Sequence, residues 1–183
     1  MAVDNPQIFL KETVSDLSWF WGNIGYVPVL VQTKDDLCFD ECLGEKAIFF
    51  NPKRFQRWGG SIAQRAGEPQ AAGDIFFSHA VSHFGAYERN HNFFYALYNP
   101  NPDPTHIAIM EAVANYPTKW LLDKKGFNGK RIMEVWYSSW DSDSRPLSEK
   151  IFNTFCSHGP DEFMRFVSKY SPHDAKTYQH LLA

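Results

Sequence analysis

The sequence GDIFFSHAVSHFGAYERNH, residues 73–91, carries His79 and His83 four positions apart on an apolar run. Residues with this spacing lie one turn apart on the same face of an α-helix, with about 5–6 Å between their Cβ atoms. Two imidazoles placed in this way can hold one metal ion, and neutral imidazole nitrogen suits zinc. We therefore expect a helix here, capped by Asp74, with both histidines as candidate zinc ligands.

The residue after the first histidine is Ala80. Zinc peptidases with two histidines at this spacing carry a glutamate there, which acts as the general base toward water. The stretch therefore has both ligands and lacks the base. A histidine pair at this spacing also occurs on helices that bind no metal, where one ring is half-buried in the core and the other is hydrogen-bonded. That interpretation stays open on the pair alone.

A third candidate ligand is Glu111, in the stretch HIAIMEAVANYPTKWLLDKKG. We expect a helix from about Thr105 to Gly126, with Asp103 or Thr105 as its cap and a kink or break at Pro117. A carboxylate that faces an apolar core is costly unless it is paired or bound to a metal, which gives Glu111 a physical reason to be a ligand. The alternative is that Glu111 lies at the margin of the apolar face and points to solvent.

Other polar residues are candidates for supporting roles. Asn115 lies one helical turn after Glu111 and is a candidate to orient a ligand histidine, as residues behind metal-bound imidazoles commonly do. His106 precedes Glu111, and we expect it at a solvated helix start. A peptidase also needs a donor for the oxyanion. The sequence does not choose among Tyr137, His158, His173 and His180.

The remaining elements surround these two helices. The segments 26–32 and 46–51 are rich in β-branched and aromatic residues and are predicted strands. We expect the second of them at a sheet edge beside the metal, where an extended peptide could pair with it. A helix is predicted from Pro6, capped by Asn5. Residues 131–140 are predicted to be a strand or an extended arm, and helices are predicted over 146–159, 160–171 and 173–183.

A strand, a helix with a histidine pair and a later helix with a glutamate follow one another in this chain. This order resembles the gluzincin metallopeptidases and is most similar to ImmA/IrrE-like zincin domains. In that family the third ligand opens a helix with an alanine- and leucine-rich pattern. The segment EAVANYPTKWLL matches that pattern at Glu111, Ala112, Ala114, Asn115, Leu121 and Leu122. The resemblance covers about residues 26–124. It implies a single zincin-like α+β domain over 1–183, with a small mixed β-sheet packed on the active-site helix and additional C-terminal helices.

The resemblance also implies a function, which is zinc-dependent hydrolysis of peptide bonds in a protein or peptide substrate. His79, His83 and Glu111 would hold Zn²⁺, and Ala80 stands where the family has its catalytic glutamate. Pro117 is a second departure from the family pattern. We expect that Ala80 is an engineered replacement that leaves the chain inactive. The alternative is a natural pseudo-peptidase that acts as a non-catalytic protein-binding module.

The composition argues against several other classes of protein. The net charge of −3 gives no reason to expect nucleic-acid binding, and no apolar run approaches the ~20 residues that span a bilayer. The chain has an odd number of cysteines, which argues against a disulfide framework and favours a cytoplasmic location, with a secreted effector as the alternative. These cysteines are Cys38, Cys42 and Cys156. Cys38 and Cys42 are a weaker candidate for a structural zinc site.

Overall fold

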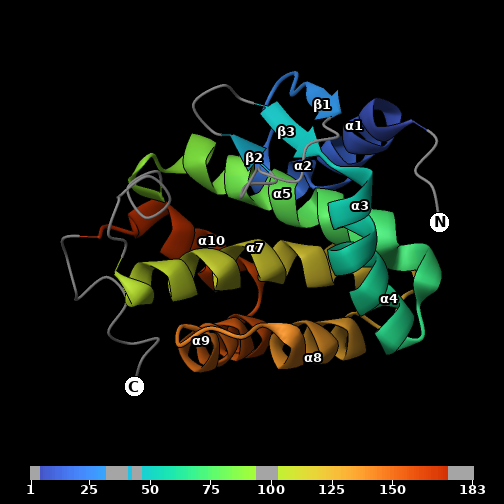
Figure 1. The fold of residues 1–183 in the computed structure, drawn as a ribbon. Coiled ribbons are helices and arrows are strands. Elements are labelled where there is room, and N and C mark those ends of the chain that lie inside the picture. Colours follow the sequence, from blue (N-terminus) through green and yellow to red (C-terminus); the bar gives the residue numbers. More distant parts are fainter. Residues whose placement is uncertain (1–4, 32–40, 43–46, 94–102, 173–183) are drawn as a thin grey trace.

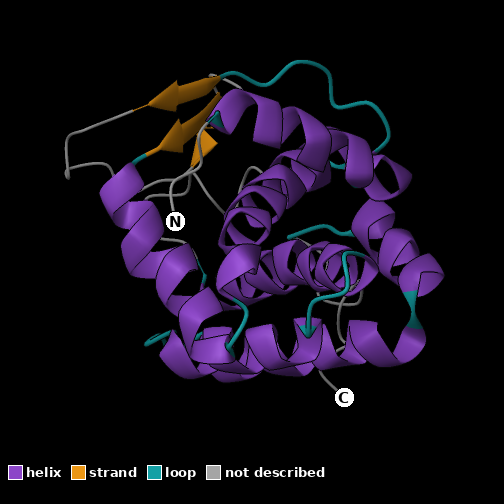
Figure 2. Cartoon of the chain, turned by 90° about the vertical axis from the view of Figure 1, so that its right-hand side faces the viewer, coloured by secondary structure: helices purple, strands orange, loops and turns teal. Residues whose placement is uncertain are grey.

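The computed structural model describes residues 5–31, 41–42, 47–93 and 103–172 (Figure 1). Most of these residues are helical, and the strands form one small sheet at one side of the molecule (Figure 2). The buried apolar side chains, from Leu10 near the N-terminus to Tyr170, form one hydrophobic cluster. Helices and a small mixed sheet are therefore present together, as an α+β fold requires. Among the described residues, no helix has both the length and the apolar character needed to cross a membrane.

The helix that carries the two histidines is α5, Ala72–Arg89, and it runs through the middle of the molecule (Figure 1). Every residue from Ala72 to Ala86 is buried, as expected of a helix that is apolar on all sides. The prediction that Asp74 caps this helix is wrong. Ala71 occupies the cap position, and Asp74 lies in the first turn, where its carboxylate accepts a hydrogen bond of 2.6 Å from Lys125 Nζ.

The helix that carries Glu111 is α7, Pro104–Lys124, which packs against α5. Asp103 caps it as predicted, because its carboxylate accepts a hydrogen bond of 2.8 Å from the backbone N–H of Thr105. Of the predicted kink or break at Pro117, the break is wrong, since the helix continues through this residue. A proline inside a helix costs about 3 kcal/mol or more. Here α7 is held between α5 and α9, and this packing outweighs the local preference.

The sheet has the strand order β1-β3-β2, with β1 Val29–Val31, β2 Glu41–Cys42 and β3 Ala47–Phe50. β1 pairs with β3 in parallel and β2 pairs with β3 antiparallel, so the sheet is mixed. The prediction that the segment 46–51 forms an edge strand is therefore wrong, because β3 is the central strand. The sheet rests on α5 through Phe50, whose ring lies 5.7 Å from the rings of both Phe76 and Phe77.

The N-terminal region begins with α1, Pro6–Asp16, and α2, Ser18–Trp21. Asn5 caps α1 as predicted, accepting a hydrogen bond from the backbone N–H of Ile8. Between β3 and α5 the chain forms four short helical turns in succession. These are α3 Pro52–Phe55, the π-helical turn η1 Gln56–Gly60, α4 Ser61–Ala66 and the 3-10 turn η2 Pro69–Ala71.

Three helices follow α7. They are α8 Gly129–Ser139, α9 Arg145–His158 and α10 Pro160–Lys169. The helices α9 and α10 agree with the predictions. The prediction of a strand or extended arm over 131–140 is wrong, because most of this segment belongs to the helix α8. Its buried residues Ile132, Met133, Trp136 and Tyr137 recur at helical spacing, and Asn128 caps the helix by accepting from Arg131 N. The helix predicted over 173–183 lies outside the described residues.

Candidate metal centre

Three potential ligand atoms converge between α5 and α7. His79 Nε2 and His83 Nε2 lie 3.0 Å apart. Glu111, which reaches across from α7, places Oε2 3.5 Å from His79 Nε2 and Oε1 3.8 Å from His83 Nε2. In the described part of the chain, these residues form a group of His, Cys, Asp or Glu side chains with the spacing of a metal site, and their ligand atoms all lie within 4.8 Å of one another. The structure thus brings together the three residues that the sequence singled out as ligands.

These separations suit a small tetrahedral ion. Bonds from zinc to imidazole nitrogen or carboxylate oxygen measure about 2.0–2.2 Å, so two ligands at a tetrahedral angle are roughly 3.3–3.6 Å apart. The two nitrogens lie 3.0 Å apart, and each carboxylate oxygen of Glu111 lies near one of them, at 3.5 Å for Oε2 from His79 and 3.8 Å for Oε1 from His83. Two nitrogens and one oxygen are also a ligand set typical of zinc.

The protonation of the two histidines favours metal binding. Burial, reinforced by the neighbouring His83, lowers the pKa of His79 well below its ordinary value, although the hydrogen bond to Asn115 acts in the opposite direction. Burial also lowers the pKa of His83, to about 4. Both rings are therefore neutral near pH 7, and each has one nitrogen with a free lone pair. The two Nε2 atoms are hydrogen-bonded to each other, so one of them carries a proton that a metal ion would have to displace.

Asn115 lies behind the first histidine. Its Oδ1 is 3.1 Å from His79 Nδ1, on the side of the ring opposite the three-ligand group. An amide oxygen only accepts hydrogen bonds, so Nδ1 carries the proton of the neutral ring and Nε2 is left unprotonated. Asn115 is fully buried and stands one turn after Glu111 on α7. A single helix thus supplies both a potential ligand and the residue that orients another ligand.

Two tryptophans enclose the His79 ring. The ring of Trp136, from α8, lies 4.5 Å from it, and that of Trp58 lies 5.6 Å away. Trp58 belongs to the turn η1, and π-helical turns are frequent at functional sites. Sequence reasoning missed both residues. The signal that could have found Trp136 is the helical spacing of its apolar neighbours, whereas nothing in the local sequence around Trp58 indicates that it approaches α5.

The group opens to solvent at Glu111. Its side chain is 24% exposed, compared with 9% for His79 and 3% for His83. A ligand or a water molecule would therefore approach from the α7 side of the two rings. Ala80, at the position of the missing base, is only 1% exposed and belongs to the hydrophobic core cluster. A longer side chain at this position would have to extend from the packed core toward the three ligand atoms.

The structure places the other candidates away from this opening. Contrary to the expected solvated position, His106 is buried, and its Nδ1 lies 2.6 Å from the hydroxyl of Tyr170. Tyr137 is buried behind Asn115, and His158 is hydrogen-bonded within α9, to Thr154 O. His173, His180 and Cys38 lie outside the described residues, as does the side chain of Cys42. Cys156 is a free, exposed thiol on α9.

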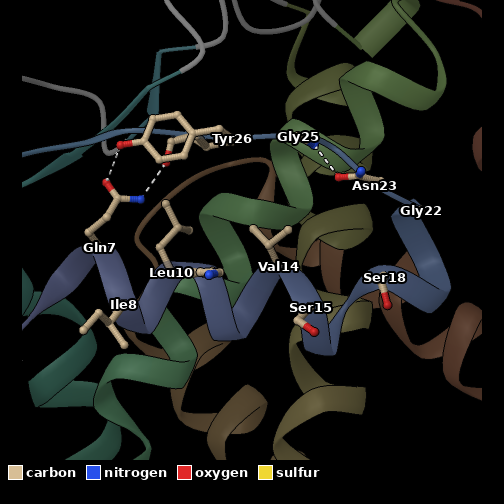
Figure 3. Close-up of a pocket in the computed structure, with 12 residues that line it drawn as sticks. Gln7, Ile8, Leu10, Val14, Ser15, Ser18, Gly22, Asn23, Gly25 and Tyr26 are labelled. Carbon is tan, nitrogen blue, oxygen red and sulfur yellow. Dashed lines mark hydrogen bonds between the residues drawn. The ribbon is translucent and has the colours of Figure 1, made fainter.

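A separate apolar pocket of about 480 Å³ lies between α1 and the segment 22–27 (Figure 3). The side-chain amide of Gln7 spans one side of it. Gln7 Nε2 donates to Val27 O at 3.0 Å, and Gln7 Oε1 accepts from Val29 N at 2.8 Å. Gln7 thus satisfies backbone groups at the start of β1 that a neighbouring strand would otherwise bind, which is one way to protect a sheet edge from unwanted pairing.

Comparisons of the chain with models of known protein families, with curated proteins and with solved structures find no match.

Proposed function

We propose that this protein binds one Zn²⁺ ion through His79, His83 and Glu111. The observation that carries the proposal is the convergence of nitrogens of two neutral imidazoles and one carboxylate within 4.8 Å of one another, with Glu111 the most exposed of the three side chains. Three protein ligands with one open side are also the arrangement of catalytic rather than structural zinc sites.

We further propose that the site is that of a gluzincin-type zinc metallopeptidase whose substrate is a protein or peptide. The proposal is supported by the order of the residues along the chain, since a histidine pair on one central helix is followed by a glutamate on the next long helix. When bound, zinc acts as a Lewis acid toward water and the substrate carbonyl. The methyl group of Ala80 accepts no proton, so the chain as it stands lacks the general base and should be inactive.

A second candidate is a natural pseudo-peptidase that binds another protein without cleaving it. The observation that favours it is the packing of Ala80 within the core, where the methyl group is buried with its apolar neighbours. In this case zinc would have a structural role at the site, and Ala80 would be the native residue. The two candidates share the ligands and differ in whether a carboxylate at position 80 restores hydrolysis.

The experiment that separates them is a pair of substitutions, Ala80→Glu and Ala80→Gln. The two side chains have nearly the same size, so they disturb the core to a similar extent, but only the glutamate can accept a proton. If the protein is a peptidase, Ala80→Glu loaded with zinc should cleave a fluorescence-quenched random peptide library at least about 100-fold faster than Ala80→Gln, within the range of general base catalysis. Equal rates for the two zinc-loaded variants would contradict the peptidase proposal and favour the binding module.

A further inference from the structure

Behind the three-ligand group, four buried side chains form a hydrogen-bonded chain that joins four helices. It runs from His79 on α5 to Asn115 on α7, then to Tyr137 on α8 and Ser148 on α9. Asn115 Nδ2 donates to the hydroxyl of Tyr137 at 3.1 Å, and that hydroxyl lies 3.4 Å from Ser148 Oγ. Asn115 and Ser148 are fully buried, and Tyr137 is 2% exposed. Water is therefore a poor substitute for any missing partner.

The direction of the hydrogen bond between Asn115 and Tyr137 follows from the orientation of the amide. The amide nitrogen donates to the hydroxyl oxygen of Tyr137, and that hydroxyl shares a second hydrogen bond with Ser148 Oγ, in which either oxygen can be the donor. Burial raises the pKa of Tyr137, so the phenol stays protonated at neutral pH. With its nitrogen bound to Tyr137, the Asn115 amide presents its oxygen to His79 Nδ1. The proton of the His79 ring is thereby held on Nδ1.

The opposite orientation of the amide would have the opposite effect. If Tyr137 donated to the oxygen of Asn115, the amide nitrogen would face His79 Nδ1 and would require a lone pair there. The ring proton would then sit on Nε2, which is the atom that faces His83 Nε2 at 3.0 Å and Glu111 at 3.5 Å. A protonated Nε2 is not a metal ligand. The orientation of one buried amide therefore decides whether the ring proton of His79 lies on Nδ1 or on Nε2, and in the first case His83 is the donor of the hydrogen bond between the two Nε2 atoms.

We infer that Tyr137, anchored by Ser148, is a positioning residue that holds the Asn115 amide in the orientation that keeps His79 Nε2 unprotonated and ready for metal. This inference rests on the proposed zinc site and adds a control of that site by the C-terminal helices α8 and α9. Loss of partners behind a metal-bound imidazole commonly weakens metal binding by about 10–100-fold. Removing the Tyr137 hydroxyl would leave Asn115 Nδ2 without this partner and free the amide to turn over.

The test compares Tyr137→Phe and Ser148→Ala with the control Tyr170→Phe. Tyr170 is also buried, and its hydroxyl is also hydrogen-bonded to a histidine, His106, but it does not belong to this chain of hydrogen bonds. The first readout is the tautomer of His79 in the metal-free protein, from the ¹⁵N chemical shifts of its ring. The second is the dissociation constant for Zn²⁺, from competition with a chromophoric chelator.

The wild type and Tyr170→Phe should show the proton on Nδ1, whereas Tyr137→Phe should show a substantial population with the proton on Nε2 and about 10–100-fold weaker zinc binding. Ser148→Ala removes only the anchor and should change both readouts in the same direction by less, and it remains informative if Tyr137→Phe does not fold. An unchanged tautomer in Tyr137→Phe and Ser148→Ala, with zinc affinity within twofold of Tyr170→Phe, would overturn the inference. Failure of the wild type itself to bind zinc would instead contradict the proposed function, while the tautomer readout would still test the role of Tyr137.

Discussion

Single residues set the chemistry of this site through their burial. His83 is 3% exposed in its side chain and its pKa is lowered to about 4, while that of His79 is lowered well below its ordinary value. Neutral rings are good ligands for a metal ion, but they make the metal-free protein sensitive to acid. Lowering the pH protonates these histidines more readily in the unfolded chain than in the folded one.

The pH dependence of stability should reveal this difference. An unfolded histidine has a pKa of about 6.5 and His83 in the folded protein about 4, so the unfolded state binds more protons between these values. The free energy of unfolding of the metal-free protein should therefore fall as the pH is lowered from about 6.5 to about 4, with roughly 3 kcal/mol of that loss due to His83.

Urea denaturation in the presence of a chelator, repeated across this pH range, measures the effect. The comparison is between the wild type and His83→Gln, with His158→Gln as the control because His158 is exposed on α9. His83→Gln should lose less stability between pH 6.5 and 4 than the other two proteins. The same pH dependence in all three would show that His83 is not held neutral by burial.

At the residue scale, the sequence singled out His79 and His83 from their spacing, Glu111 from its apolar surroundings, and Asn115 from its place one turn after Glu111. It named Tyr137 only as one of four candidate oxyanion donors, and it did not identify Trp58 or Ser148. Their approach to His79 depends on how η1, α8 and α9 pack against α5 and α7, and contacts between distant segments leave no local signal. The roles of all these residues in metal binding stay predictions.

At the scale of elements, α5 needs small residues where other helices approach it closely. A Cβ atom added at Gly85 would lie within the indole ring of Trp21 from α2, and Trp21 is itself packed against the ring of Phe163. Gly60 provides a matched contrast. It also has helical backbone angles, but the nearest atom to an added Cβ is the flexible end of Gln56, at 3.1 Å.

Gly85→Ala should therefore lower the free energy of unfolding by at least about 1–3 kcal/mol, the usual cost of overpacking a core. Gly60→Ala should leave it unchanged or raise it by up to about 1 kcal/mol, because alanine restricts the unfolded chain more than glycine does. Chemical denaturation of both variants measures the difference. Equal effects of the two substitutions would contradict the close contact between α2 and α5.

Sequence patterns predicted α1, α5, α7, α9 and α10 because each has a cap or a clear helical periodicity. The errors have physical causes. Residues 131–140 are rich in aromatic and β-branched side chains, which favour strands locally, yet their burial against α7 makes α8 a helix. Pro117 is tolerated for a similar reason, and the central place of β3 depends on pairing with strands on both sides, which its own sequence does not specify.

At the scale of the whole molecule, the proposed metal site lies between the two central helices. α5 packs against the sheet and α1, whereas α7 packs against α9 and α8, so an ion held by His79, His83 and Glu111 would link the two halves of the core (Figure 1). Because an ion that binds only the folded protein stabilises it by mass action, zinc at 100 times its dissociation constant should add about 2.7 kcal/mol to the free energy of unfolding.

Thermal unfolding with zinc and with a chelator measures this contribution. The wild type should melt at a higher temperature with zinc, and the shift should be reversed by chelation. Glu111→Gln, which keeps the size of the side chain and removes its charge, should show little or no shift. Glu134→Gln, at an exposed position on α8, is the control and should behave as the wild type does. An equal zinc-dependent shift in Glu111→Gln would place the ion elsewhere.

The most direct test of the central claim is the anomalous scattering of zinc in crystals of the zinc-loaded protein, recorded on both sides of the zinc absorption edge. One strong peak per chain is expected, at about 2.0–2.2 Å from His79 Nε2, His83 Nε2 and a carboxylate oxygen of Glu111. A zinc peak bound by other residues would contradict the proposed site. So would a structure with no zinc peak in which Glu111 points away from the two histidine rings.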